Sequence, residues 1–253
     1  MRGAEPSRGR VPVVRARPID PVRPARSGVE GGLAYSLWLP SGPGPPPAGV
    51  VILHGAGSCK ESHYDFARAA LPLGVAALSF DQRGHGESDG PMDERALDDV
   101  AAMAALLREA IGDPAAPIAL RGSSMGGYLA ILAAERVGAG AVVAICPASA
   151  GGLRRGLSDG TLRFGADVGA LDALLLAHRL PAAVESLSAP LLLLHAQGDE
   201  QVPIQHSREL AAAFRSPQSR LIEVPGGHHR SIQHDDELQA VSLRFVQGAL
   251  GLR

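Results

Sequence analysis

Lysine is almost absent from this chain of 253 residues, and cysteine, aromatic residues and long apolar runs are scarce. Lys60 is the only lysine among 23 arginines, which is typical of a GC-rich bacterial genome. The two cysteines, Cys59 and Cys146, cannot build a disulfide framework, so we expect buried free thiols in a cytoplasmic protein. No apolar stretch reaches the ~20 residues of a membrane span. The net charge of -2 gives no general attraction to nucleic acid or to membranes.

The N-terminal segment, residues 1–27, is rich in arginine and proline and has no apolar core of the kind found in secretory signals. We expect it to be a tail that is disordered or adds an edge strand around residues 11–15. Residues 28–253 are expected to form a single domain. Its Leu-rich stretch, residues 151–187, is expected to form a small cap or lid.

From Leu33 onward, apolar strand patterns alternate with helical patterns about six times. The predicted strands are Leu33–Leu39, Gly49–His54, Val75–Phe80, Ile118–Arg121, Ala141–Cys146, Pro190–Ala196 and Arg220–Val224. The predicted helices are Ser62–Leu71, Asp93–Ile111, Met125–Val137, Val168–His178, Ile204–Phe214 and Asp236–Ala249. This rhythm predicts an α/β fold, a mostly parallel sheet with helices on both faces. Ligands of such sheets bind in the loops that follow the strands.

The pattern Gly-x-Ser-x-Gly occurs three times, centred on Ser88, Ser124 and Ser158, so the pattern alone does not identify a nucleophile. Only Ser124 directly follows a predicted strand and directly precedes a predicted helix. That context is the one a strained nucleophile turn requires. Ser88 and Ser158 lie in stretches that we interpret as turns. Ser124 is therefore the predicted nucleophile.

A serine nucleophile needs a base, a group that orients the base, and donors for the oxyanion. Asp199 follows the strand Pro190–Ala196 and is the predicted acid, with Glu200 as the alternative. The base is expected after the next strand, where His228 and His229 adjoin. The predicted oxyanion donors are the backbone N–H groups of Ala56 and Met125. Two other histidines, His54 and His195, are interpreted as structural, and no zinc-ligand spacing occurs.

In the order of these signals, the chain resembles the α/β-hydrolase family over about residues 28–250. The motifs are His-Gly-Ala-Gly at 54–57, Arg-Gly-His-Gly-Glu-Ser at 83–88, Gly-Ser-Ser-Met-Gly at 122–126, Gly-Asp at 198–199 and Gly-Gly-His-His at 226–229. The first motif looks most like small esterases of the feruloyl or cinnamoyl type. The resemblance implies that Arg83, His85 and Ser88 brace the site. It also implies a Gly-x-x-His base, which favours His229 over His228.

The sequence thus predicts a serine hydrolase that cleaves carboxylic esters of small to medium uncharged acyl groups without a cofactor or metal. The substrate is expected to be a small molecule, and no nucleic-acid or membrane partner is expected. A thioesterase, an amide or small-peptide hydrolase, and a non-catalytic binding protein on this scaffold are the alternatives. An oligomer is possible, and the sequence does not indicate its state.

Overall fold

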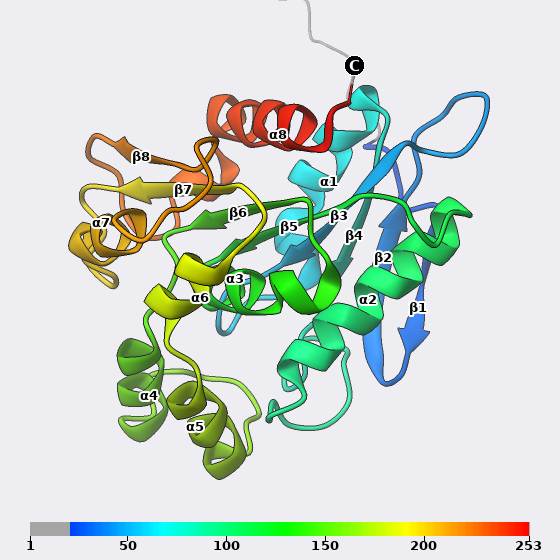
Figure 1. Cartoon of the computed structure of the whole chain (residues 1–253). Helices are drawn as coiled ribbons and strands as arrows, with labels where there is room; N and C mark the ends of the chain where they lie inside the picture. Colours follow the sequence, from blue (N-terminus) through cyan, green and yellow to red (C-terminus); the bar gives the residue numbers. More distant parts are fainter. Residues whose placement is uncertain (1–20, 253) are drawn as a thin grey trace, which may run out of the picture.

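The computed structural model of the chain describes residues 21–252 (Figure 1). Its strands are β1 Arg26–Glu30, β2 Leu33–Trp38, β3 Ala48–Leu53, β4 Val75–Phe80, β5 Ile118–Ser123, β6 Ala141–Ile145, β7 Leu191–Ala196 and β8 Arg220–Val224. The α-helices are α1 Tyr64–Ala70, α2 Ala96–Ile111, α3 Met125–Val137, α4 Ala150–Ser158, α5 Val168–Ala177, α6 Leu180–Ser186, α7 Ile204–Ala211 and α8 Asp236–Leu250. Short 3₁₀ turns are η1 Lys60–His63, η2 Leu71–Leu73 and η3 Ile232–His234.

One eight-stranded sheet organises the molecule, in the order β1-β2-β4-β3-β5-β6-β7-β8. The first two strands form an antiparallel hairpin, β2 runs antiparallel to β4, and all the remaining neighbours are parallel. The carboxyl ends of β3 to β8 therefore lie along one edge of the sheet. This edge is where the sequence places the candidate site loops.

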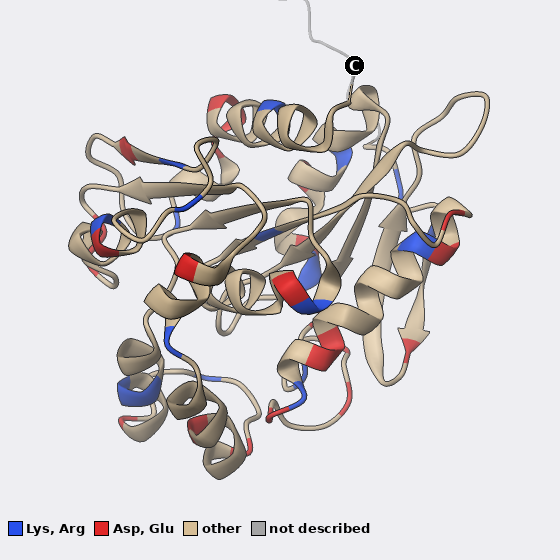
Figure 2. Ribbon diagram, in the orientation of Figure 1, with Lys and Arg blue, Asp and Glu red and all other residues tan. Residues whose placement is uncertain are grey.

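Helices cover both faces of the sheet, which explains why the central strands are buried along their whole length. Helices α1 and α8 pack on one face, where Phe66 and Phe245 join the core. Helices α2, α3, α6 and α7 pack on the other, where Val100 and Leu129 do so. Charged side chains are spread over the helices and loops (Figure 2). No helix of the described chain is long and apolar enough to cross a membrane.

The prediction of a mostly parallel sheet flanked by helices is confirmed, with three differences in detail. The strand β1 was not predicted, because its five residues are all exposed and carry no apolar alternation. Helices α4 and α6 were not predicted either, because three glycines interrupt the pattern of α4 and a proline that of α6. Cys146 is buried as predicted, but Cys59 is only half-buried; both are free. The suggested edge strand at residues 11–15 lies outside the described residues.

The segment predicted as a cap contains α4, α5 and α6. Helices α4 and α5 pack against each other at one end of the molecule, beyond α3 and α6 (Figure 1). Most of the leucines of this segment contact the apolar core, including Leu153, Leu171 and Leu175, while Leu176 is exposed. That the segment moves as a lid stays a prediction.

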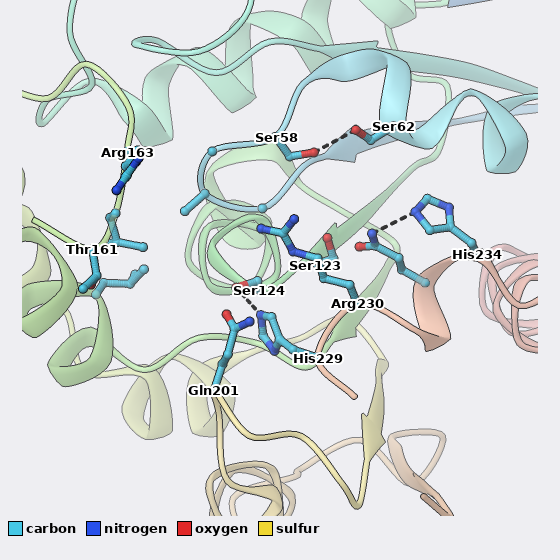
Figure 3. Close-up of a pocket in the computed structure, with 16 residues that line it drawn as sticks. Ser58, Ser62, Ser123, Ser124, Thr161, Arg163, Gln201, His229, Arg230 and His234 are labelled. Carbon is cyan, nitrogen blue, oxygen red and sulfur yellow. Dashed lines mark hydrogen bonds between the residues drawn. The ribbon is translucent and has the colours of Figure 1, made fainter. Parts of the chain in front are cut away.

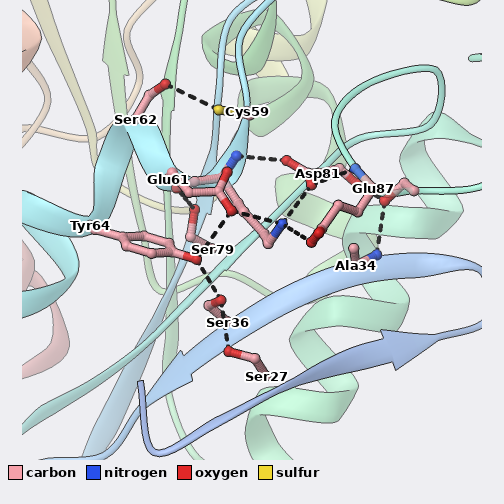
Figure 4. Close-up of polar contacts among 12 residues, drawn as sticks. Ser27, Ala34, Ser36, Cys59, Glu61, Ser62, Tyr64, Ser79, Asp81 and Glu87 are labelled. Carbon is pink, nitrogen blue, oxygen red and sulfur yellow. Dashed lines mark hydrogen bonds and ion pairs between the residues drawn. The ribbon is translucent and has the colours of Figure 1, made fainter. Parts of the chain in front are cut away.

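The only lysine, Lys60, is buried at the start of η1 in a charged cluster with Glu61, Asp81 and Glu87, which Figure 4 labels. The Lys60 ammonium lies 2.8 Å from Asp81, 2.7 Å from Glu87 and 2.9 Å from Glu61. The Asp81 carboxylate also accepts hydrogen bonds from the backbone N–H groups of Lys60 and Glu87. Burial alone would raise the pKa of Asp81, but these hydrogen bonds and the ammonium hold it below its usual range. The cluster thus ties η1 to the loop after β4.

We expect Lys60→Met to destabilise the protein by about 3 kcal/mol, because the substitution leaves the fully buried Asp81 carboxylate without its cation. The measurement is urea unfolding at neutral pH, with the exposed Arg244→Met as the matched control. Since the folded-state pKa of Asp81 is lowered, its contribution is present above its unfolded pKa of about 4 and is lost as the pH falls through the folded value. A decrease of less than about 1 kcal/mol in the free energy of unfolding would show that the Lys60–Asp81 ion pair does not stabilise the fold appreciably.

Candidate active site

Ser124 lies on a strained turn between the end of β5 and the start of α3. Its φ of 52° and ψ of -118° are values that a side-chain-bearing residue rarely adopts. The backbone on both sides holds this turn in place: the Ser124 N–H donates to the Ile145 carbonyl, and the Ser124 carbonyl accepts from the Ala148 N–H. The strand–turn–helix context predicted for Ser124 is confirmed.

The glycines two residues before and after Ser124 are required by space. A Cβ at Gly122 would lie 2.1 Å from the Gly126 carbonyl oxygen, and one at Gly126 would lie 2.3 Å from the Leu53 carbonyl oxygen. Helix α3 can therefore approach β3 and β5 only because these positions carry no side chain. The close approach keeps the serine at the carboxyl edge of the sheet.

His229 and Asp199 reach Ser124 from two loops that are distant in the sequence. The Nε2 atom of His229 lies 2.9 Å from Ser124 Oγ, and its Nδ1 atom lies 2.7 Å from Asp199 Oδ2. Figure 3 shows the His229 ring beside Ser124. His229 and Asp199 are buried, while Ser124 is half-buried. The three residues form one hydrogen-bonded chain that opens to solvent at the serine.

The Asp199 carboxylate is held in its ionised form. Its Oδ1 accepts the backbone N–H groups of Gln201 and Val202, and its Oδ2 faces His229 and, at 3.4 Å, Nε2 of His195. Burial alone would raise the pKa of Asp199, but the hydrogen bonds from His195, His229 and Val202 hold it well below its usual range. Asp199 can therefore orient His229 as a carboxylate at all ordinary pH values.

The alternative residues lie elsewhere. His228 is exposed, and its backbone N–H bonds to the Ser231 hydroxyl. Glu200 is also exposed. Ser88 braces β2, because it accepts the Ala34 N–H and donates to the Asp81 carbonyl. Ser158 is the last residue of α4 rather than part of a turn, and lines a separate surface hollow. The geometry thus favours Ser124, Asp199 and His229 over each alternative.

The loop after β3 is fixed next to the serine by histidine side chains. His54 accepts the Gln82 N–H at 3.0 Å, and burial followed by the neighbouring His85 lowers the pKa of His54 to about 4. It is therefore a neutral structural residue, as the sequence predicts. His85 in turn accepts the Gly57 N–H at 3.1 Å. This bond and the Arg83–Asp99 ion pair agree with the bracing role that the resemblance implies.

Of the two predicted oxyanion donors, Ala56 lines the pocket that contains Ser124 and His229. Met125 follows Ser124 directly at the first position of α3, where a backbone N–H has no partner within the helix. A Cβ on Gly55, the residue before Ala56, would lie only 3.3 Å from the Ser124 Cβ. The loop after β3 and the serine are therefore close neighbours. The donor roles stay a prediction.

Arg121 is a residue of the site region that the sequence reading missed. Its guanidinium is fully buried on β5, donates to the Gln233 carbonyl at 2.8 Å, and lies 4.1 Å from the ring centroid of Phe66. Burial lowers the pKa of Arg121 to about 10. Because Gln233 follows His229 in the same loop, Arg121 ties the strand of the serine to the loop of the histidine. Nothing in the sequence pattern indicates this role, because Arg121 is a single charged residue in an otherwise apolar strand.

The pocket over Ser124 has a volume of about 730 Å³ and a largely polar lining (Figure 3). Gln201, Arg163, Arg230 and Gln233 line it together with Ser124 and His229, and none of these four was predicted. Two leucines of the predicted cap, Leu153 and Leu162, form its apolar side. These residues come from segments far apart in the sequence, so only the fold brings them together.

Among the described residues, one set of side chains has ligand atoms close enough for a metal ion: Cys146, Asp199 and His229, within 4.8 Å of one another. Burial raises the pKa of the Cys146 thiol, which disfavours the thiolate that metals bind. The facing atoms of Asp199 and His229 are already hydrogen bonded to each other. The set therefore fits proton transfer better than metal binding.

The sequence profile of a hydrolase family, described as "Serine aminopeptidase, S33", matches residues 44–164. The uncharacterized protein Rv2307c of Mycobacterium tuberculosis is 32% identical over 222 residues, which cover 83% of this chain and 72% of that protein. Two solved structures share the fold. The monoacylglycerol lipase of Paleococcus ferrophilus has a TM-score of 0.66 at 20% identity, over 87% of this chain and 99% of its own.

The second solved structure is Est1E of Butyrivibrio proteoclasticus with bound ferulic acid. Its TM-score is 0.67 at 23% identity, over 90% of this chain and 99% of its own. At these identities the structural likeness concerns the fold. Together with the profile match, the strained serine turn and the order of the strands, it leads to one assignment. The chain belongs to the α/β-hydrolase family.

Proposed function

We propose that this hydrolase cleaves carboxylic esters through an acyl-enzyme on Ser124. His229 takes the proton from Ser124 Oγ as the oxygen attacks the ester carbonyl. The tetrahedral intermediate collapses when His229 gives that proton to the leaving alcohol. Water, deprotonated by His229, then attacks the acyl-enzyme and releases the carboxylic acid and free Ser124. Asp199 orients the imidazole and stabilises its protonated form.

The observation that carries this proposal is the unbroken hydrogen-bonded chain Ser124–His229–Asp199, at 2.9 and 2.7 Å. Such a chain is what a weak hydroxyl nucleophile requires, and a binding protein has no need of it. The oxyanion is expected to be held by the N–H groups of Ala56 and Met125. Two fold neighbours, a monoacylglycerol lipase and Est1E with bound ferulic acid, support an ester rather than a peptide substrate.

A narrow apolar crevice beside the pocket is the proposed place for the acyl group. Leu153 and Leu162 line both the pocket and the crevice, which continues along Met125, Leu157 and Phe164. The crevice holds only about 10 Å³ of free space, so any acyl group must displace side chains to enter, and a long or rigid one must displace the most. The lining carries no charge, which supports an uncharged acyl group.

Labelling with a fluorophosphonate should modify Ser124. The reagent reacts with a serine whose proton is removed by a neighbouring base, and only Ser124 has such a base among the three Gly-x-Ser-x-Gly serines. Peptide mass spectrometry identifies the adduct, and Ser124→Ala should abolish it. The matched control is Ser158→Ala, which should label normally. An adduct on Ser88 or Ser158 would refute the assignment.

His229→Ala should lower kcat for a butyryl ester by ~10⁴-fold or more, since the serine loses its base. His228→Ala is the matched control, because this exposed neighbour contacts neither Ser124 nor Asp199. In the wild-type protein, turnover should fall at low pH, because a protonated imidazole cannot accept the Ser124 proton. An inactive His228→Ala beside an active His229→Ala would reverse the assignment.

Across acetyl, butyryl, octanoyl and feruloyl esters of one alcohol, kcat/KM should be highest for the short to medium acyl groups. Each methylene that contacts the wall formed by Leu153 and Leu162 contributes about 0.8 kcal/mol when buried, until the crevice is filled. The rigid feruloyl ring should be tolerated at best. A strong feruloyl preference would contradict this prediction and favour an esterase of the feruloyl type. Cleavage of aminoacyl anilides alone would contradict it and favour a peptidase.

A further inference from the structure

We infer that the alcohol half of the substrate carries an anionic group, a phosphate or a carboxylate, which Arg230 binds directly and Arg163 attracts. The inference rests on the proposed ester hydrolysis. Both arginines line the pocket that contains Ser124 and His229, and none of the lining residues in the described part of the chain is acidic. Figure 3 shows both side chains at this pocket, Arg163 on one side of Ser124 and Arg230 beside His229.

Within residues 21–252, neither guanidinium forms an ion pair with a carboxylate. Six other arginines of residues 21–252 form ion pairs with Asp or Glu, among them Arg83 with Asp99 and Arg154 with Asp172. Arg163 and Arg230 form none within this part of the chain, and both side chains are exposed. The planar fork of arginine matches the oxygens of carboxylate and phosphate, and two unneutralised forks make the pocket attractive to an anion.

The backbone fixes where the two side chains start. Arg163 precedes Phe164, whose ring stacks on His85 at 4.4 Å, and Gly165, whose N–H donates to the Gly84 carbonyl at 2.9 Å. A Cβ at Gly84 would lie 1.8 Å from the Gly165 oxygen, so the two segments touch. Arg230 directly follows His229, in the loop that Arg121 holds through Gln233. Because the backbone at both positions is already ordered, only the two side chains lose entropy when they bind an anion.

The chemistry of the site assigns the anion to the alcohol half. His229 must hand its proton to the leaving oxygen, so the leaving alcohol lies on the His229 side of the pocket. Arg230 lies on that same side. The apolar crevice behind Leu153 and Leu162 has no charged lining residue and suits the acyl half. Arg163 lies on another side of Ser124 (Figure 3), so its charge adds to the positive potential of the pocket rather than to direct binding of the leaving group.

Two ester pairs test the inference, each with one butyryl group. The phosphate pair is 1-butyrylglycerol 3-phosphate against 1-butyrylglycerol, and the carboxylate pair is 3-butyryloxypropanoate against 3-butyryloxypropanamide. For at least one pair, we expect the anionic ester to have the higher kcat/KM. Whichever pair shows the larger ratio identifies the anion. Arg230→Gln should lower this ratio about tenfold and Arg163→Gln about threefold.

The matched control is Arg244→Gln, since Arg244 is exposed on α8 and lies outside the pocket. This substitution should leave the ratio of kcat/KM between the anionic and the neutral ester unchanged. Raising NaCl from about 0.05 to about 0.5 M should also lower the ratio, because salt screens the attraction. Equal or faster cleavage of both neutral esters, or a ratio that Arg230→Gln does not change, overturns the inference while leaving ester hydrolysis intact. Failure to cleave any of the four esters would instead count against the proposed function.

Discussion

The close approach of α3 to the sheet is the constraint on which the candidate site depends. The surrounding backbone holds Ser124 at a φ of 52°. Gly122 and Gly126 allow the helix to start in contact with β3 and β5. The cost of this strained residue, of the order of 1–3 kcal/mol, is offset by the buried sheet on both sides. The result is a hydroxyl that stands above the sheet edge at the start of a helix, where developing negative charge is favoured.

Sheet order then brings the partners of the serine into reach. Strands β5, β6, β7 and β8 are neighbours in the sheet and run parallel, so the loops after β7 and β8 open toward the same edge as Ser124. Hydrogen bonds fix each loop individually: the Val202 N–H holds Asp199, and Arg121 holds the Gln233 carbonyl. A buried guanidinium without a carboxylate partner is costly, and here it joins the strand that carries Ser124 to the segment that carries His229.

Sequence patterns predicted the parts of this arrangement that repeat locally. The helix Met125–Val137 and the strands Val75–Phe80 and Arg220–Val224 match the predicted bounds, because their apolar periodicity is strong. The distinction between His228 and His229 lies in the loop backbone, where Gly226 and Gly227 both adopt positive φ and turn one imidazole inward. No periodicity reports such a turn. The same holds for Arg163 and Arg230, which approach the serine only through contacts between distant segments.

The single lysine, although it does not line the pocket, helps to fix the loops next to the serine. Its compact ammonium, with three donors, meets three carboxylates at 2.7 to 2.9 Å, a convergence that the planar fork of arginine does not match. Gly86 closes over the cluster, since a Cβ there would lie 2.2 Å from the Asp81 carboxylate. Lys60 directly follows the loop of Ala56, and Asp81 opens the loop of His85, which accepts the Gly57 N–H. The cluster therefore joins the loop of Ala56, which lines the pocket, to the loop of His85, and the only lysine of a chain that otherwise uses arginine stands at this position.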